Sequence, residues 1–158
     1  MKLVSHSAGH TRFIGEALAL QLQPGDVLLL SGPMGAGKSE LARGVARGLG
    51  VRGYVTSPAF TILQAHEDGR LPLYHFDWYR LSSPEELYEL SMDEYLHMNG
   101  VAIVEWPDRA AEALPARCLN ITLTPLDENE RVIDFVPEGG FRPLDGEALR
   151  RAERSEPR

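Results

Sequence analysis

Cysteine is nearly absent from the sequence, because Cys118 is the only one. A single thiol can form no intramolecular disulfide and no cysteine-rich zinc site, which fits a reducing compartment. Long apolar runs are also missing, and none approaches the roughly 20 residues of a membrane-spanning helix. The N-terminus lacks the basic segment, apolar stretch and cleavage site of a signal peptide. We therefore predict a cytoplasmic protein without a membrane span, in which Cys118 packs inside a strand.

Positive charge is scarce too, with 16 Lys and Arg against 23 Asp and Glu and a formal net charge of −7. Broad neutralisation of nucleic-acid phosphates needs clustered cations, so this balance argues against an extended nucleic-acid interface. The length of 158 residues and a hydrophobic content of 43% suit one domain with one core. We expect that domain over residues 1–141. We expect the polar tail, 142–158, to fray from it, with at most a short helix at 147–153.

Hydrophobic periodicity predicts a mixed α/β fold. Apolar residues recur at helical spacing in four segments, which are 11–22, 39–49, 84–96 and 107–114. Two short continuous apolar runs, 27–30 and 101–104, are typical of strands that are buried on both faces. Two pairs of segments, 60–67 with 71–77 and 119–124 with 132–136, predict antiparallel hairpins. The expected architecture is a P-loop NTPase-like three-layer fold whose mixed sheet has a parallel centre and antiparallel hairpins.

The run from Gly32 to Ser39 matches G-x-x-x-x-G-K-[ST], the phosphate-binding loop. Its glycines let backbone N–H groups turn toward a β-phosphate, Lys38 reaches the β and γ oxygens, and Ser39 offers a hydroxyl to Mg²⁺. A strand precedes the motif and a helix follows it, which argues against a mere glycine-rich turn, while the spacing is wrong for a Rossmann site. ATP and Mg²⁺ are the expected ligands. The expected nucleotide-binding residues are Gly35, Ala36, Gly37, Lys38, Ser39 and Glu40.

Acidic residues end two of the predicted strands. Mg²⁺ at a phosphate loop needs a carboxylate from a neighbouring strand end, and Glu105 and Asp77 both have that position. We assign the metal to Ser39 and Glu105, because the strand before Glu105 is the more clearly buried one. Asp77 would orient waters, which makes Lys38, Asp77 and Glu105 the expected catalytic set. The alternative is that either acid caps a helix or forms an ion pair.

Three further features have both a functional and a structural interpretation. His75 shares a strand face with Asp77, but it is equally typical of a hydrogen-bonded core histidine. The segment 56–61 presents hydroxyls in a Pro-restricted turn, which suits a γ-phosphate sensor or an ordinary turn. Trp106 is either a partner-facing anchor or part of the core.

Four motifs occur in an order that resembles the bacterial TsaE (YjeE) family of ATPases. They are G-x-x-G-A-G-K-S at 32–39, T-S-P-x-F-T at 56–61, L-P-L-Y-H-F-D-x-Y-R at 71–80 and V-E-W-P-D at 104–108. The second and third are much more specific than the phosphate loop, because few other P-loop families place such segments between the loop and an acidic strand. The resemblance covers about residues 5 to 137.

This resemblance implies a P-loop ATPase domain that works with TsaB and TsaD. Its ATP hydrolysis would support formation of N6-threonylcarbamoyladenosine beside the anticodon of tRNA, which it would meet only indirectly through the complex. By motif position, Thr11 would lie near the nucleotide base. The sequence departs from the family at Ala59, where Thr is usual, and at Asp108, where Glu is frequent. The first difference leaves open which hydroxyl of 56–61 senses the γ-phosphate, whereas the second preserves the charge.

Two other classes share these sequence features. A small-molecule kinase would have the same loop but would close an Arg-bearing lid over its acceptor, and Arg80 is the only arginine well placed between the motifs. A nucleotide-binding adaptor that never hydrolyses ATP would differ only in whether Asp77 and Glu105 take part in catalysis.

Overall fold

The computed structural model describes residues 1–53, 62–89, 92–97 and 99–155. A seven-stranded sheet in the order β1-β7-β6-β2-β5-β4-β3 forms its centre. The strands are β1 (Lys2–Ser5), β2 (Val27–Ser31), β3 (Leu63–His66), β4 (Leu73–Asp77), β5 (Val101–Glu105), β6 (Cys118–Pro125) and β7 (Arg131–Glu138). The predicted strand segment 60–67 begins in residues 54–61, which lie outside the described part of the chain.

The middle of the sheet is parallel and its margins are antiparallel. β4, β5, β2 and β6 run in one direction, while β3, β7 and β1 are antiparallel to their neighbours. β5 is buried along its whole length, as expected for an apolar run with neighbours on both sides and helices above and below. Both predicted hairpins are confirmed. β1 was not predicted, because four residues with mixed polarity at a sheet margin give little periodic signal.

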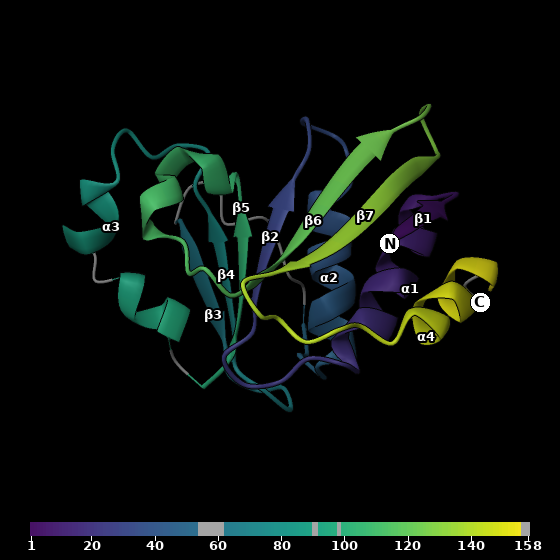
Figure 1. Ribbon diagram of the computed structural model, residues 1–158, viewed down its shortest axis with the longest axis horizontal. Coiled ribbons are helices and arrows are strands. Elements are labelled where there is room, and N and C mark those ends of the chain that lie inside the picture. The colour runs from purple at the N-terminus through teal and green to yellow at the C-terminus, as the bar shows by residue number, and fades with distance from the viewer. Residues whose placement is uncertain (54–61, 90–91, 98, 156–158) are drawn as a thin grey trace.

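Helices cover both faces of the sheet and complete the predicted three layers (Figure 1). One core contains buried residues of α1 (Ala8–Ala19), α2 (Lys38–Gly48) and α4 (Gly146–Arg154). The other core includes side chains from α3 (Glu85–Glu89) and from two 3-10 helices, η1 (Met92–His97) and η2 (Pro107–Ala113). The single helix predicted at 84–96 is therefore represented by two short segments, between which residues 90–91 are not described. Among the described residues, no helix has the length and apolar character needed to cross a membrane.

Close packing of α1 on α2 fixes the helix that follows the phosphate loop. A Cβ at Gly44 in α2 would overlap the backbone carbonyl of Arg12 in α1, so only glycine allows this approach. Ala42, Val45 and Ala46 of α2 are buried in the same core. The start of α2 is therefore held by a rigid neighbour rather than by the loop alone.

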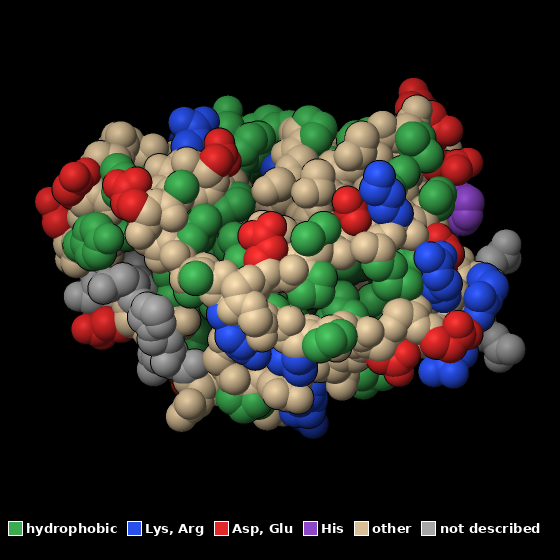
Figure 2. Space-filling model, in the orientation of Figure 1, with side chains coloured by type: hydrophobic (Ala, Val, Ile, Leu, Met, Phe, Trp, Pro, Cys, Tyr) green, Lys and Arg blue, Asp and Glu red, His purple; other side chains and the backbone are tan. Residues whose placement is uncertain are grey.

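The structure corrects the expectation of a frayed tail as far as Ser155. α4 packs on α1 and β1, with Leu149 fully buried and Ala152 nearly so. Glu153 accepts a hydrogen bond from the backbone N–H of Val4, which ties α4 to the margin of the sheet. The tail looks polar because the outward side of α4 carries arginines, which Figure 2 shows gathered at the right of the view. Two apolar residues three positions apart suffice to dock one helical face.

Candidate functional site

The phosphate-loop segment joins β2 to α2 in the predicted context. Gly35 and Gly37 have φ angles of 78° and 105°, a region that residues with a Cβ rarely adopt. Gly37 is the N-cap of α2 and offers no side-chain hydrogen bond to the helix. The first N–H groups of α2 therefore have no side-chain cap, and the positive end of the helix faces the loop. This arrangement is suited to an anion.

Lys38 is almost completely buried at the first position of α2, with 6% of its surface exposed. Its Nζ donates a hydrogen bond to the Gly32 carbonyl at 2.6 Å and lies 3.6 Å from the centroid of the Trp106 ring. Burial lowers the pKa of Lys38 below its ordinary value of 10.5, and the carboxylates of Glu105, Asp77 and Asp108 oppose that shift. A poorly hydrated cation that donates to a neutral carbonyl gains strongly from contact with a phosphate oxygen.

The two predicted acids lie side by side. Asp77 and Glu105 are register partners at the C-terminal ends of the parallel strands β4 and β5, and their exposed fractions are 5% and 3%. Asp77 accepts a hydrogen bond from the backbone N–H of Tyr79 at 2.9 Å. Glu105 pairs with His75 at 2.7 Å between Oε2 and Nε2. Each acid therefore has a local hydrogen-bond partner, and neither of these two contacts caps a helix.

Two neighbouring hollows open at this end of the sheet. The first has a volume of about 220 Å³, and Lys38, Ser39, Asp77 and Glu105 all line it. The second has a volume of about 310 Å³, and it shares Gly35, Lys38, Ser39 and Glu105 with the first. The phosphate loop therefore stands between two hollows with the same lysine, hydroxyl and carboxylate at their boundary. The structure brings together most of the residues that the sequence predicted for the site.

An aromatic pair flanks the first hollow. Trp106 follows Glu105 directly and has a φ of 57°, which is unusual for a bulky residue. Its ring lies 5.0 Å from that of Tyr79, and the guanidinium of Arg109 lies 5.4 Å from the Tyr79 ring centroid. Tyr79 is partly exposed, and Trp106 is partly buried against the second core. Trp106 therefore packs against the core and also lines the first hollow, and its role as a partner-facing anchor stays a prediction.

Arg131 belongs to the site, and sequence reasoning missed it. It is the first residue of β7, is 8% exposed and lines the second hollow. Its Nη1 donates to the Ala36 carbonyl at 3.3 Å, and a Cβ at Gly37 would overlap its guanidinium. Its Nε is buried with no hydrogen-bond partner among the described residues. The only sequence signal is an arginine before a predicted strand, and the contact with a loop so distant in sequence depends on the register of β7.

Other predicted residues lie differently. Thr11 is fully buried, its hydroxyl pairs with Ser5 and donates to the Ser7 carbonyl, and within the described chain neither hollow includes it. Glu40 lines the second hollow but pairs with Arg12 and Arg43. The segment 56–61, predicted to sense a γ-phosphate, lies outside the described residues.

A glycine loop joins a parallel strand to a helix that begins with a buried lysine, and two acids lie at adjacent strand ends. Together these features define a P-loop NTPase-like α/β protein. Comparison with known proteins narrows this class. The model of the family "Threonylcarbamoyl adenosine biosynthesis protein TsaE" matches residues 5–133. The chain belongs to the TsaE family, which takes part in tRNA threonylcarbamoyladenosine biosynthesis.

Individual relatives agree with the family assignment. The chain is 43% identical to a TsaE protein of Bacillus subtilis over 129 residues, which cover 82% of this chain and 80% of the relative. It is 39% identical to a TsaE protein of Treponema pallidum over 133 residues, covering 84% and 98% of the two chains. The crystal structure of Bacillus subtilis YdiB superposes with a TM-score of 0.77 at 37% identity and covers 97% of this chain and 93% of that one.

Proposed function

We propose that this protein binds ATP with Mg²⁺ at the phosphate loop and hydrolyses it slowly in the cytoplasm. Hydrolysis would support a complex with TsaB and TsaD in forming threonylcarbamoyladenosine on tRNA. The observation that carries the proposal is the convergence of Lys38, Ser39, Asp77 and Glu105 on one hollow. A kinase or a passive adaptor could share the loop, but membership of the TsaE family favours the ATPase.

Phosphate binding follows from the contacts of the loop. The first N–H groups of α2 have no side-chain cap, and Lys38 can exchange its carbonyl acceptor at Gly32 for phosphate oxygens. Arg131 contributes a second buried cation beside Ala36 and Gly37. The two cations would face the phosphates from α2 and from β7.

The donor atoms present suit Mg²⁺. Ser39 and Glu105 supply a hydroxyl and a carboxylate, with the Asp77 carboxylate beside them, and hard oxygen ligands are those that Mg²⁺ prefers. Among the described residues, no group of three or more His, Cys, Asp and Glu side chains could hold a metal. This fits an ion that takes its remaining ligands from water and phosphate. When bound, Mg²⁺ would neutralise charge on the phosphates, while Asp77 would orient the attacking water.

The binding step is tested by Lys38→Ala, with Lys2→Ala as the matched control because these are the only lysines in the sequence. Lys2 is exposed in the marginal strand β1. We expect Lys38→Ala to weaken binding of a fluorescent ATP analogue by at least about 100-fold, because a desolvated charge-assisted contact is lost. Lys2→Ala should bind normally. Wild-type affinity in a folded Lys38→Ala protein would remove the basis of the proposal.

Coupling to partners is tested at the aromatic rim. Slow turnover of the isolated protein is expected if a partner supplies a missing transition-state charge, a contribution on the order of 10³-fold or more. The Trp106 ring contacts both Lys38 and the Tyr79 ring. A partner that binds these two rings would therefore be coupled to what Lys38 contacts. Phosphate release should rise when TsaB and TsaD are added, and Trp106→Ala should reduce that rise.

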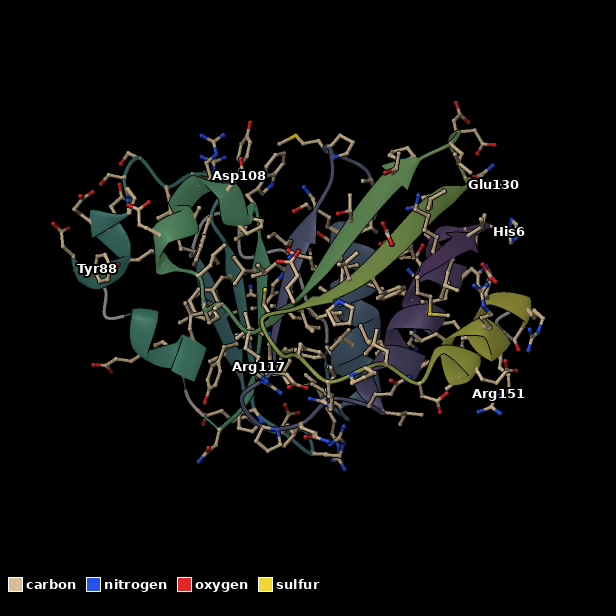
Figure 3. The ribbon with its side chains drawn as sticks, in the orientation of Figure 1. His6, Tyr88, Asp108, Arg117, Glu130 and Arg151 are labelled. Carbon is tan, nitrogen blue, oxygen red and sulfur yellow. The ribbon has the colours of Figure 1, made fainter. Side chains whose placement is uncertain are left out.

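Tyr88→Ala is the matched control for Trp106→Ala. Tyr88 is an aromatic residue on α3 that is 52% exposed. Figure 3 shows Tyr88 well separated from Asp108, which is two residues after Trp106 in the sequence. Stimulation should therefore survive Tyr88→Ala. Fast hydrolysis by the isolated chain, unaffected by TsaB and TsaD, would contradict the partner-coupled mechanism.

A further inference from the structure

His75 is a buried titratable residue that the proposed chemistry leaves unused. It lies in the middle of β4 with 1% of its surface exposed. It shares a strand face with Asp77, and Glu105 lies opposite Asp77 on β5. This places His75 diagonally behind Glu105, and its Nε2 lies 2.7 Å from Glu105 Oε2.

The surroundings of the imidazole define which ring nitrogen carries the proton. A carboxylate of Glu105 can only accept, so Nε2 must be the N–H donor. His75 Nδ1 is buried with no hydrogen-bond partner among the residues that the structure describes. The hydrogen bond therefore runs from the Nε2–H of His75 to the carboxylate of Glu105.

This hydrogen bond restricts the Glu105 carboxylate. One oxygen, Oε2, is engaged by His75, and the side chain lines both hollows beside Ser39. A hydrogen bond to one oxygen restricts the rotation of a carboxylate and so limits the directions in which the other oxygen can point. The position of the Glu105 carboxylate relative to Lys38 and Ser39 therefore depends on β4, which carries His75, as well as on β5.

We propose that His75 is a positioning residue that orients Glu105 for Mg²⁺ without touching the metal or the nucleotide. The inference rests on the proposed function, because Glu105 is the metal-binding acid in that proposal. Hydrogen-bonded partners of metal-binding carboxylates typically change metal affinity by about 10 to 100-fold when they are removed. A histidine that only fills the core would have no such selective effect.

Two amide variants distinguish a positioning residue from one that only fills the core, because their side chains differ in length. In His75→Gln the amide nitrogen takes the place of Nε2 and can donate to Glu105. In His75→Asn the same amide is shorter and takes the place of Nδ1, so the donor to Glu105 is lost. We would titrate Mg²⁺ into each variant with bound fluorescent ADP, measure ADP affinity in EDTA, and record thermal unfolding. His75→Asn should weaken Mg²⁺ about 10 to 100-fold and His75→Gln by no more than a few-fold, with ADP affinity in EDTA unchanged in both.

The variant Glu105→Gln distinguishes failure of the positioning role from failure of the proposed metal site. Adding His75→Asn to Glu105→Gln should weaken Mg²⁺ no further, because the two residues act in series. Wild-type Mg²⁺ affinity in His75→Asn, or equal loss in both amide variants, would overturn the positioning role. If His75→Asn does not fold, His75→Leu replaces it, and a Gln variant that behaves like Leu would overturn the role as well. Unchanged Mg²⁺ affinity in Glu105→Gln would instead refute the proposed metal site, and with it this inference.

Discussion

Two buried carboxylates at opposite ends of the central strands have very different surroundings. Asp26 comes directly before β2 and is fully buried, while Glu105 ends the neighbouring parallel strand β5 and is 3% exposed. Figure 3 marks the two ends by Arg117 near Asp26 and by Asp108 near Glu105. Both acids therefore belong to the same part of the sheet but contact different neighbours.

The hydrogen bonds of Asp26 are complete. Arg142 donates to both of its oxygens, at 2.8 Å and 2.5 Å, the backbone N–H of Gln23 donates at 2.8 Å, and Arg117 approaches to 3.4 Å. This pairing raises the pKa of Arg142. Among the described residues, the carboxylate of Glu105 has one hydrogen-bond partner, His75, and the nearby Lys38 has its pKa lowered by burial. A carboxylate with all its hydrogen bonds made serves the fold, whereas one with capacity left beside a hollow can take a ligand.

Asp26→Asn should have the largest effect on stability. The change leaves Arg142 facing a neutral amide, and breaking a buried ion pair costs about 3 to 5 kcal/mol. We expect about 3 kcal/mol, because Arg142 is 25% exposed and can still reach water. Urea unfolding measures the loss, with Arg117→Ala as a control that should cost less than about 1 kcal/mol. Nucleotide affinity should not change, and a stable Asp26→Asn protein with weakened nucleotide binding would reverse the comparison.

Sequence alone identified one of these two ends. The phosphate loop and the acids Asp77 and Glu105 were predictable, because a local motif and strand ends determine them. The ion pair of Asp26 with Arg142 and the contact of Arg131 with the loop were not, since each joins residues about a hundred positions apart. The docked tail was misjudged for the same reason: its polar composition is local, whereas the core that receives Leu149 is not.

Glu105→Gln should act in the opposite sense to Asp26→Asn. A neutral amide keeps an acceptor for His75 and removes a buried charge, so the free energy of unfolding should change by less than about 1 kcal/mol or increase. Mg²⁺-dependent hydrolysis should fall at least about tenfold, because the change removes a direct metal ligand. The same urea series and a phosphate-release assay measure both quantities. Destabilisation as large as that of Asp26→Asn would assign Glu105 to the fold rather than to the site.

The smallest expected effect is the pH dependence of the nucleotide-free and metal-free protein. The pKa of Lys38 in the folded protein is lower than its ordinary value of 10.5, which applies to the unfolded chain. Between these two pKa values the unfolded chain holds a proton that the folded protein has lost, so Lys38 makes the free energy of unfolding increase as pH rises. The raised pKa values of Tyr74 and Cys118 act in the opposite direction in every variant. The shift at Arg142 has the opposite direction and leaves that guanidinium charged throughout this range.

Urea unfolding at several pH values below 10.5 measures this difference. Relative to Lys38→Met, the wild type and Lys2→Met, which removes the other lysine, should both gain stability as pH rises. Saturating ATP should reduce the gain, because a phosphate contact favours the charged ammonium and raises the pKa of Lys38 again. Equal pH profiles for all three proteins would mean that Lys38 is as well accommodated as Arg142. The electrostatic argument for a difference between the Asp26 end of the sheet, where the charges are paired, and the Glu105 end, where we propose a ligand, would then fail.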